Sequence, residues 1–306
     1  MSRRSRPRGG AAPASDRSES PRRRFLKLYH GLCRSRQGWQ VFSDFCALGA
    51  LALANHVEKD EDRENRYLAI IGGYEVLEDR LALREMLGCV VDALSEALAS
   101  AGEDARPAHP AGDFLGSLFM ELELSSHWHG QFFTPYVLCE AMARMTYARE
   151  DVQRHVDEDG FVTVLEPACG AGAMAIAFAD VMREFGFLPH EHMHVVAVDV
   201  DATAAHMCFI QLSLLGVPAA VHVGNTLTGE TREVFYTPAH ILGAWSVRLW
   251  LRRLRSAVAR GEDSDCAAGA GPAAPPPPDI PHAPSPDDGA FVLALRPARQ
   301  MDLFAA

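Results

Sequence analysis

Apolar and polar residues along this chain follow two periodicities, which divide it into a helical part and a part that alternates strands with helices. From Phe25 to about Ser100, apolar residues recur at helical spacing. From Phe161 onward the pattern predicts strands at 161–165, 194–198 and 219–223, separated by helices at 173–185 and 202–215. Such alternation indicates a parallel sheet with right-handed crossovers.

Further helices are predicted at 113–124, 136–145 and 239–259, the last anchored by Trp245, Leu249, Trp250 and Leu254. The charged run 58–66 is expected to be a solvated helix start or turn. A short apolar segment, 291–295, lies near the end of the chain. The fold class is therefore α/β, with a helical N-terminal region before a doubly wound core.

Composition sets the expected boundaries. Residues 1–23 form an Arg-, Ser-, Pro- and Gly-rich arm, expected to be disordered; it is either a solvated tail or a contact for nucleic acid. The helical N-terminal region then spans 24–112 and the core 113–260. Residues 261–289 form a Pro/Ala/Gly linker, and 290–306 hold the apolar segment and a C-terminal peptide.

The net charge of −11 is unevenly distributed. Residues 1–27 hold nine basic and two acidic side chains, and the remaining residues hold 20 basic and 38 acidic ones. An acidic body repels phosphate, which argues against non-specific DNA binding by the core. Seven cysteines without a C-x-x-C pair indicate reduced thiols and a cytoplasmic protein. No apolar run has the length of a membrane span or the form of a signal peptide, so no membrane partner is expected.

The segment from Glu166 through Pro167 to Gly170 and Gly172 carries the clearest chemistry. It follows a predicted buried strand and precedes a predicted helix. Glycines in such a turn let a ligand approach the bare backbone, and the helix N-terminus favours negative charge. The turn by itself indicates a nucleotide-like ligand.

Polar residues also follow the other two strands, at the edge where ligands of doubly wound sheets bind. Asp199 ends the second strand and is suited to accept both hydroxyls of a ribose. Asn225 follows the third and is placed to meet the edge of a purine. Upstream, Thr134 and Pro135 precede a helix whose N-terminus is suited to a carboxylate. Taken singly, Asp199 is equally well a helix cap and Asn225 a turn residue.

Together these motifs resemble those of adenine-N6 DNA methyltransferases. Residues 166–172 resemble the family's [DE]-P-x-x-G-x-G motif for S-adenosylmethionine (SAM). Residues 130–135 are similar to the G-Q-F-[FY]-T-P signature of modification subunits in type I restriction-modification systems, and 113–121 to the D-x-x-G-x-[IL]-[YF] lead-in before it. Residues 224–227 resemble the G-[DN]-x-L adenine motif. The resemblance covers about residues 75–228.

The resemblance implies a Rossmann-like core that binds SAM and transfers its methyl group to adenine in DNA. Glu166 would orient the glycine turn or meet the methionine ammonium, and Thr134 would hold the methionine carboxylate. Asp199 would bind the ribose and Asn225 the adenine. The implied site is Thr134, Pro135, Glu166, Pro167, Gly170, Gly172, Asp199 and Asn225.

One motif of that family is missing from the sequence. The family's chemistry uses Asn/Asp/Ser-Pro-Pro-aromatic at the end of a fourth strand to hold the target amino group and stack on the flipped base. No such tetrapeptide occurs here, so no catalytic residue is assigned. The nearest cluster, 236–238, lacks the acceptor and is expected to close a loop against the Trp245/Trp250 helix. The sheet is expected to be truncated, with an edge covered by that helix or by another chain.

Two further patterns are weaker. Gln300, Leu303 and Phe304 resemble the pentapeptide that binds the bacterial sliding clamp; alternatively the Leu-Phe pair packs back on the domain. His190, His192 and His194 alternate, which would place three imidazoles on one strand face. A solvated strand entry is favoured there over a metal site.

Two functions follow. The first is a SAM-dependent adenine-N6 DNA methyltransferase, acting alone or as a subunit beside a specificity or other protein subunit. The alternative is a catalytically inactive SAM-binding regulatory protein that acts through DNA-associated partners. The resemblance favours the first, and the missing motif favours the second.

Overall fold

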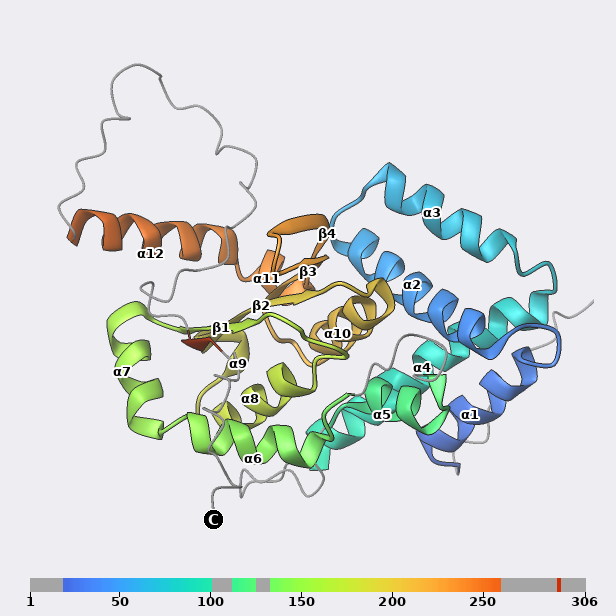
Figure 1. Cartoon of the computed structure of the whole chain (residues 1–306), viewed down its shortest axis with the longest axis horizontal. Helices are drawn as coiled ribbons and strands as arrows, with labels where there is room; N and C mark the ends of the chain where they lie inside the picture. Colours follow the sequence, from blue (N-terminus) through green and yellow to red (C-terminus); the bar gives the residue numbers. More distant parts are fainter. Residues whose placement is uncertain (1–18, 101–111, 125–132, 260–290, 293–306) are drawn as a thin grey trace, which may run out of the picture.

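The computed structural model describes residues 19–100, 112–124, 133–259 and 291–292, shown in Figure 1. Its centre is a five-stranded sheet in the order β4-β3-β2-β1-β5. The strands are β1 (Val162–Glu166), β2 (Met193–Asp199), β3 (Ala219–Asn225), β4 (Glu230–Tyr236) and β5 (Phe291–Val292). All neighbours are parallel except β3 and β4, which are antiparallel. The predicted α/β fold with parallel strands β1, β2 and β3 is confirmed, and β4 makes the sheet mixed.

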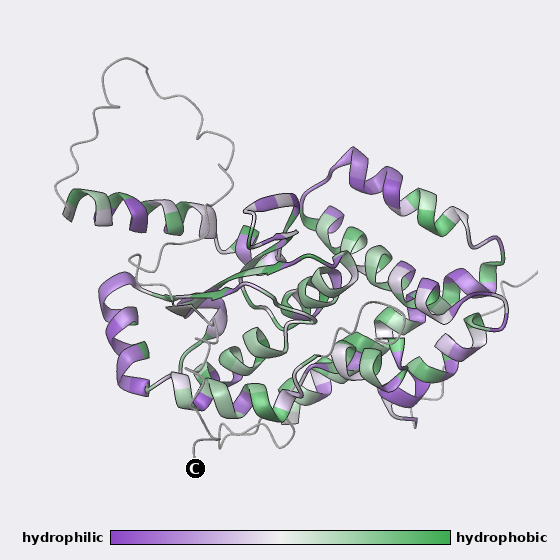
Figure 2. Ribbon diagram, viewed as in Figure 1, coloured by the Kyte–Doolittle hydropathy of each residue, from purple (hydrophilic) through white to green (hydrophobic). Residues whose placement is uncertain are grey.

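Helices α8 (Ala173–Glu184) and α10 (Ala202–Leu214) connect the three central strands and pack on the sheet. Figure 2 shows that apolar residues concentrate in these strands and helices. The observed bounds lie within two residues of the predicted ones, because the apolar runs and the glycine or acidic residues that end them are local signals.

The N-terminal helices are α1 (Pro21–Leu32), α2 (Gly38–Val57), α3 (Glu61–Gly72), α4 (Leu77–Ser100) and α5 (Phe114–Glu121). They share one continuous apolar core with the sheet domain. Gly49 of α2 lies so close to α10 that an added Cβ would be 2.9 Å from Ile210 Cδ1. Asp60 caps α3 through the Arg63 N–H at 2.8 Å, so the charged run is indeed a solvated helix start.

Helices α6 (Tyr136–Thr146) and α7 (Arg149–Asp159) lead into β1, and the short α9 (Pro189–His192) leads into β2. The single helix predicted at 239–259 is wrong. It is two helices, α11 (Pro238–Leu242) and α12 (Trp245–Ala259), separated by Gly243 and by Ala244 with a φ of 50°. A positive φ at a non-glycine residue is incompatible with a continuous right-handed helix.

Strand β4 is the element that apolar periodicity did not predict. Its side chains are mostly exposed or half-buried, and only Phe235 is buried. It pairs with the end strand β3 by returning antiparallel after a turn, so backbone pairing rather than apolar burial makes it a strand. A polar edge strand of this kind is invisible to a search for apolar runs.

At the other edge, β5 pairs in parallel with β1 through Val164 and Leu165, as expected for the apolar segment near the end of the chain. The sheet is short for its fold class, as predicted. The helix expected to cover a sheet edge with Trp245 and Trp250 packs through only one of them. Trp245 is fully buried against Phe161 and His194, whereas Trp250 is 58% exposed.

In the part of the chain that the structure describes, no helix is long and apolar enough to cross a membrane. The six cysteines within it are all free thiols.

Candidate functional site

The carboxyl ends of three adjacent parallel strands bring the predicted acidic and amide residues to one edge of the sheet. Glu166 is the last residue of β1, Asp199 of β2 and Asn225 of β3. The register pairs Glu166 with Ala197 and Asp199 with Val223, so the three strand ends are staggered by only a few residues. This is the edge at which doubly wound sheets bind ligands.

The glycine turn between β1 and α8 is folded back onto the end of β2. The backbone N–H of Gly170 donates to Asp199 Oδ2 at 2.8 Å, and the N–H of Cys169 donates to the Val198 carbonyl at 2.9 Å. Gly170 has a φ of 52° and Gly172, the N-cap of α8, a φ of 95°. Both values favour glycine, which explains the spacing of the motif.

Asp199 therefore shapes the turn as well as facing the site. Its second oxygen, Oδ1, accepts the N–H of Asp201 at 2.9 Å. A carboxylate offers about four lone-pair positions, so two backbone hydrogen bonds leave it able to accept further donors. Burial raises the pKa of Asp199, and the hydrogen bonds from Asp201 and Gly170 counteract that shift.

Glu166 is 7% exposed at the end of β1. Burial raises the pKa of its carboxyl group to about 7; the hydrogen bond from the Ala168 backbone opposes this shift and the charge of Asp199 adds to it. A buried carboxyl group with a pKa near 7 favours a cationic ligand, since a positive group beside it would stabilise its ionised form.

The raised pKa of Glu166 predicts a pH dependence of stability. Between about pH 4.5 and 7 the unfolded chain ionises this carboxyl while the folded protein keeps it protonated. The free energy of unfolding contributed by Glu166 should therefore fall as pH rises through this window and stay constant above it, a change of roughly 3 kcal/mol. Urea unfolding at pH 4.5 to 8 should show this fall in wild type and lose most of it in Glu166→Gln. An equal pH profile in wild type and variant would contradict it, and the exposed Glu191→Gln serves as control.

The loop after β3 is tied to the glycine turn. The Thr226 hydroxyl donates to the Pro167 carbonyl at 2.6 Å, which fixes the position of Pro167. Asn225 Oδ1 accepts the N–H of Leu227 at 3.0 Å, as a turn residue does, while its Nδ2 group has no partner among the described residues. Gly224 is required by close packing, because a Cβ there would be 2.4 Å from the Glu230 carbonyl oxygen.

The segment that leads into α6 reaches the glycine turn through Phe133, although it is more than 30 residues away in sequence. The ring of Phe133 stands against Gly170, where an added Cβ would be 2.9 Å from Phe133 Cδ1, and it packs on Phe119 with ring centroids 5.0 Å apart. Thr134 and Pro135 are exposed, and Pro135 is the N-cap residue of α6. The preceding residues of this motif, 130–132, lie outside the described residues.

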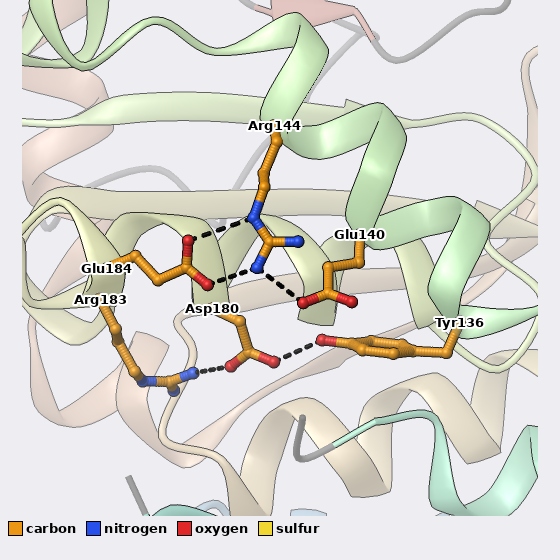
Figure 3. A network of polar contacts seen from close by, with 6 residues as sticks. All are labelled: Tyr136, Glu140, Arg144, Asp180, Arg183 and Glu184. Carbon is orange, nitrogen blue, oxygen red and sulfur yellow. Dashed lines mark hydrogen bonds and ion pairs between the residues drawn. The ribbon is translucent and has the colours of Figure 1, made fainter. Parts of the chain in front are cut away.

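A polar network holds α6 against α8 (Figure 3). Tyr136, the first residue of α6, donates its hydroxyl to Asp180, which also pairs with Arg183 at 2.6 Å. One turn from the end of α6, Arg144 bridges Glu140 at 2.7 Å and Glu184 at 2.6 Å. The network thus joins both ends of α6 to the C-terminal half of α8, the helix that begins at the glycine turn.

Two buried polar residues complete the surroundings of the turn. Asp113 accepts the Gly116 N–H at 2.8 Å and caps α5, and a Cβ on Gly116 would be 1.9 Å from its Oδ2. This explains the D-x-x-G spacing. Gln211 of α10 bonds Asp113 and the Ala171 carbonyl, both at 2.8 Å. Sequence reasoning missed Gln211, whose only signal is a polar residue within an apolar helical pattern.

The histidine pattern does not place three imidazoles on one strand face. His190 and His192 belong to α9, and only His194 lies in β2, where its Nε2 is 2.9 Å from His240 Nδ1. Among the described residues no group of metal-ligating side chains occurs. The strand entry is thus partly helical, and His194 is buried rather than solvated.

The cluster 236–238 lies at the opposite edge of the sheet from the site. The Thr237 hydroxyl accepts the N–H of Ala219, the first residue of β3, at 2.8 Å, and Thr237 caps α11. The fourth parallel strand is β5, beside β1, and the sequence that follows it, from Leu293, contains no Asn/Asp/Ser-Pro-Pro motif. Gln300, Leu303 and Phe304 lie outside the described residues.

Comparison with known families gives one match. The family model described as N-6 DNA methylase matches residues 115–244, from α5 to the end of α11. No curated protein and no solved structure gives a significant match to the chain. The matched segment contains the glycine turn, the three strand ends and the lead-in helix. Residues 115–244 of the chain are therefore similar to the N-6 DNA methylase family.

Proposed function

We propose that the edge of the sheet at Glu166, Asp199 and Asn225 binds S-adenosylmethionine. The observation that carries this proposal is the hydrogen bond from the Gly170 N–H to Asp199 at 2.8 Å, which shapes the glycine turn around an acidic strand end. In this assignment Asp199 accepts the ribose hydroxyls and Asn225 Nδ2 donates to the adenine. Gly170 and Gly172 supply the positive φ values that give the turn its shape.

Charge supports a cationic ligand over a phosphate-rich one. The glycine turn, of which Ala168 is exposed and Gly170 half-buried, lies beside two carboxyl groups, those of Glu166 and Asp199. A nucleotide diphosphate would be repelled by their ionised forms. SAM carries a sulfonium and an ammonium and no phosphate. Glu166 is suited to the ammonium, while Thr134 and Pro135 at the N-terminus of α6 are suited to the carboxylate.

The family match supports methyl transfer to the N6 amino group of adenine in DNA, by this chain alone or as a subunit with a specificity or other protein subunit. A second candidate, an inactive SAM-binding regulator, is favoured by one observation: the sequence has no Asn/Asp/Ser-Pro-Pro-aromatic motif. No catalytic residue is assigned to this chain for that reason.

Two measurements on the full chain separate these functions. Calorimetry with SAM tests cofactor binding, and labelled SAM with adenine-rich DNA tests transfer. Binding with transfer supports the methyltransferase, and binding without transfer supports the regulator. Absence of SAM binding would overturn both.

We also propose that the C-terminal peptide binds the bacterial sliding clamp, on the basis of Gln300, Leu303 and Phe304 in the sequence. Purified clamp should be retained by the immobilised protein and lost by Leu303→Ala/Phe304→Ala. The basic arm at 1–23 is the matched control region, since its deletion should leave retention unchanged. Equal retention by wild type and the double variant would refute the peptide. Clamp binding would place the protein in the cytoplasm.

A further inference from the structure

The polar side chain of Gln211 is completely buried in α10, among residues that are nearly all apolar. Its Nε2 donates to Asp113 Oδ1 and to the Ala171 carbonyl, each at 2.8 Å, and its Oε1 accepts the Leu115 N–H at 3.0 Å. A buried amide costs free energy unless its groups are paired, and here one side chain makes three hydrogen bonds to two distant segments.

These bonds meet at the proposed cofactor loop. Ala171 lies between Gly170 and Gly172, so its carbonyl fixes the peptide plane in the middle of the glycine turn. The Ala171 carbonyl accepts a hydrogen bond from Gln211, and the Gly170 N–H donates one to Asp199. Two side chains from different elements therefore hold the backbone of the turn. Glycine adopts positive and negative φ values about equally well, so these hydrogen bonds select one conformation of a turn that contains two glycines.

The other end of the network reaches the lead-in helix. Asp113 caps α5 through Gly116 while it accepts from Gln211, and Leu115 is bonded to Gln211 directly. Gln211 thus links the start of α5 to the glycine turn across α10. Burial raises the pKa of Asp113, and the hydrogen bonds from Gln211 and Gly116 counteract that shift.

We propose that Gln211 is a positioning residue for cofactor binding, which holds the glycine turn in its binding conformation through the Ala171 carbonyl. The inference rests on the proposed SAM site, since the affinity it predicts is that for SAM. It assigns no contact between Gln211 and the cofactor.

The test separates positioning from simple stability. Gln211→Met keeps the length and fills the space but removes all three hydrogen bonds. Gln211→Leu also removes all three hydrogen bonds without adding a charge beside Asp113, and serves if the methionine variant does not fold. The matched control is Thr237→Val. It also removes a fully buried polar group, a hydroxyl bonded to three backbone groups, but at the opposite edge of the sheet. Those groups are the Ala219 N–H, the His240 N–H and the Val217 carbonyl. Three quantities are measured: the midpoint of thermal unfolding, the SAM affinity by calorimetry, and amide hydrogen exchange at 169–172 without SAM.

We expect all three variants to lower the unfolding midpoint. Only the Gln211 variants should weaken SAM binding about tenfold and speed amide exchange at 169–172. An affinity within twofold of wild type in the Gln211 variants would overturn the inference, as would equal weakening by Thr237→Val. If wild type does not bind SAM, the proposed function fails. The exchange measurement then still decides whether Gln211 fixes the turn: unchanged exchange would refute it.

Discussion

Asp199→Ala is expected to weaken SAM binding about 100-fold or more and to abolish any methyl transfer with it. Asp199 is the acceptor proposed for the ribose hydroxyls, and hydrogen bonds to a charged group contribute about 1.5–3 kcal/mol each. The same carboxylate also accepts the Gly170 N–H at 2.8 Å. Its removal therefore costs a ligand contact and releases the glycine turn at once.

Asp199→Asn divides these two roles, because it keeps the shape of the side chain and one acceptor oxygen but loses the charge. Its affinity should lie between those of wild type and the alanine variant. The matched control is Asp201→Ala, two residues further on, where the carboxylate caps α10 through the Ala204 N–H at 2.9 Å. Loss of that cap should cost about 1 kcal/mol of stability with little change in SAM affinity. Similar affinities for Asp199→Ala and Asp201→Ala in calorimetry would argue against a site at the end of β2.

Trp245→Ala should lower the free energy of unfolding by about 3–5 kcal/mol, the usual cost of truncating a fully buried tryptophan. Its ring is inaccessible to solvent and packs edge-on against Phe161 with centroids 5.0 Å apart. On its other side the Arg248 guanidinium lies 3.8 Å from the ring centroid. This residue fastens α12 to the amino ends of β1 and β2, far from the proposed cofactor edge.

Trp250→Ala is the control, because it removes the same side chain from the same helix at a position that is 58% exposed. Its effect should stay below about 1 kcal/mol. Urea unfolding of both variants measures the difference, and SAM affinity should be close to that of wild type in each folded protein. Equal losses of stability would show that α12 is not packed as described.

Only part of the role of Trp245 and Trp250 was predictable from the sequence. Helical spacing identified both as anchors of one helix, yet Gly243 and the left-handed Ala244 break that helix, and only Trp245 reaches the core. Periodicity gives the faces of a helix but not which face meets the sheet, which depends on residues such as Phe161 more than 80 positions away.

The candidate site was likewise predictable only in part. The strand ends at Glu166 and Asp199 and the glycine turn between them were predictable, because parallel strands bring their carboxyl ends to one edge. The contact of Phe133 with Gly170 brings the segment before α6 to the turn, and the role of Thr134 stays a prediction. The role of Gln211 was not predictable, since no residue near it in sequence needs a buried amide as a partner. Its hydrogen-bond partners, Asp113, Leu115 and Ala171, come close to it only in the folded protein.

By itself, the sequence determined the parallel α/β core, the glycine turn and the resemblance to adenine-N6 methyltransferases, because these depend on short-range periodicity and on backbone angles that glycine permits. The tertiary structure alone decided that the polar segment at Glu230–Tyr236 is a strand, that His194 pairs with His240, and that Gln211 fastens the turn. Those outcomes depend on hydrogen-bond partners and burial supplied by segments far away in the chain, which no local pattern encodes.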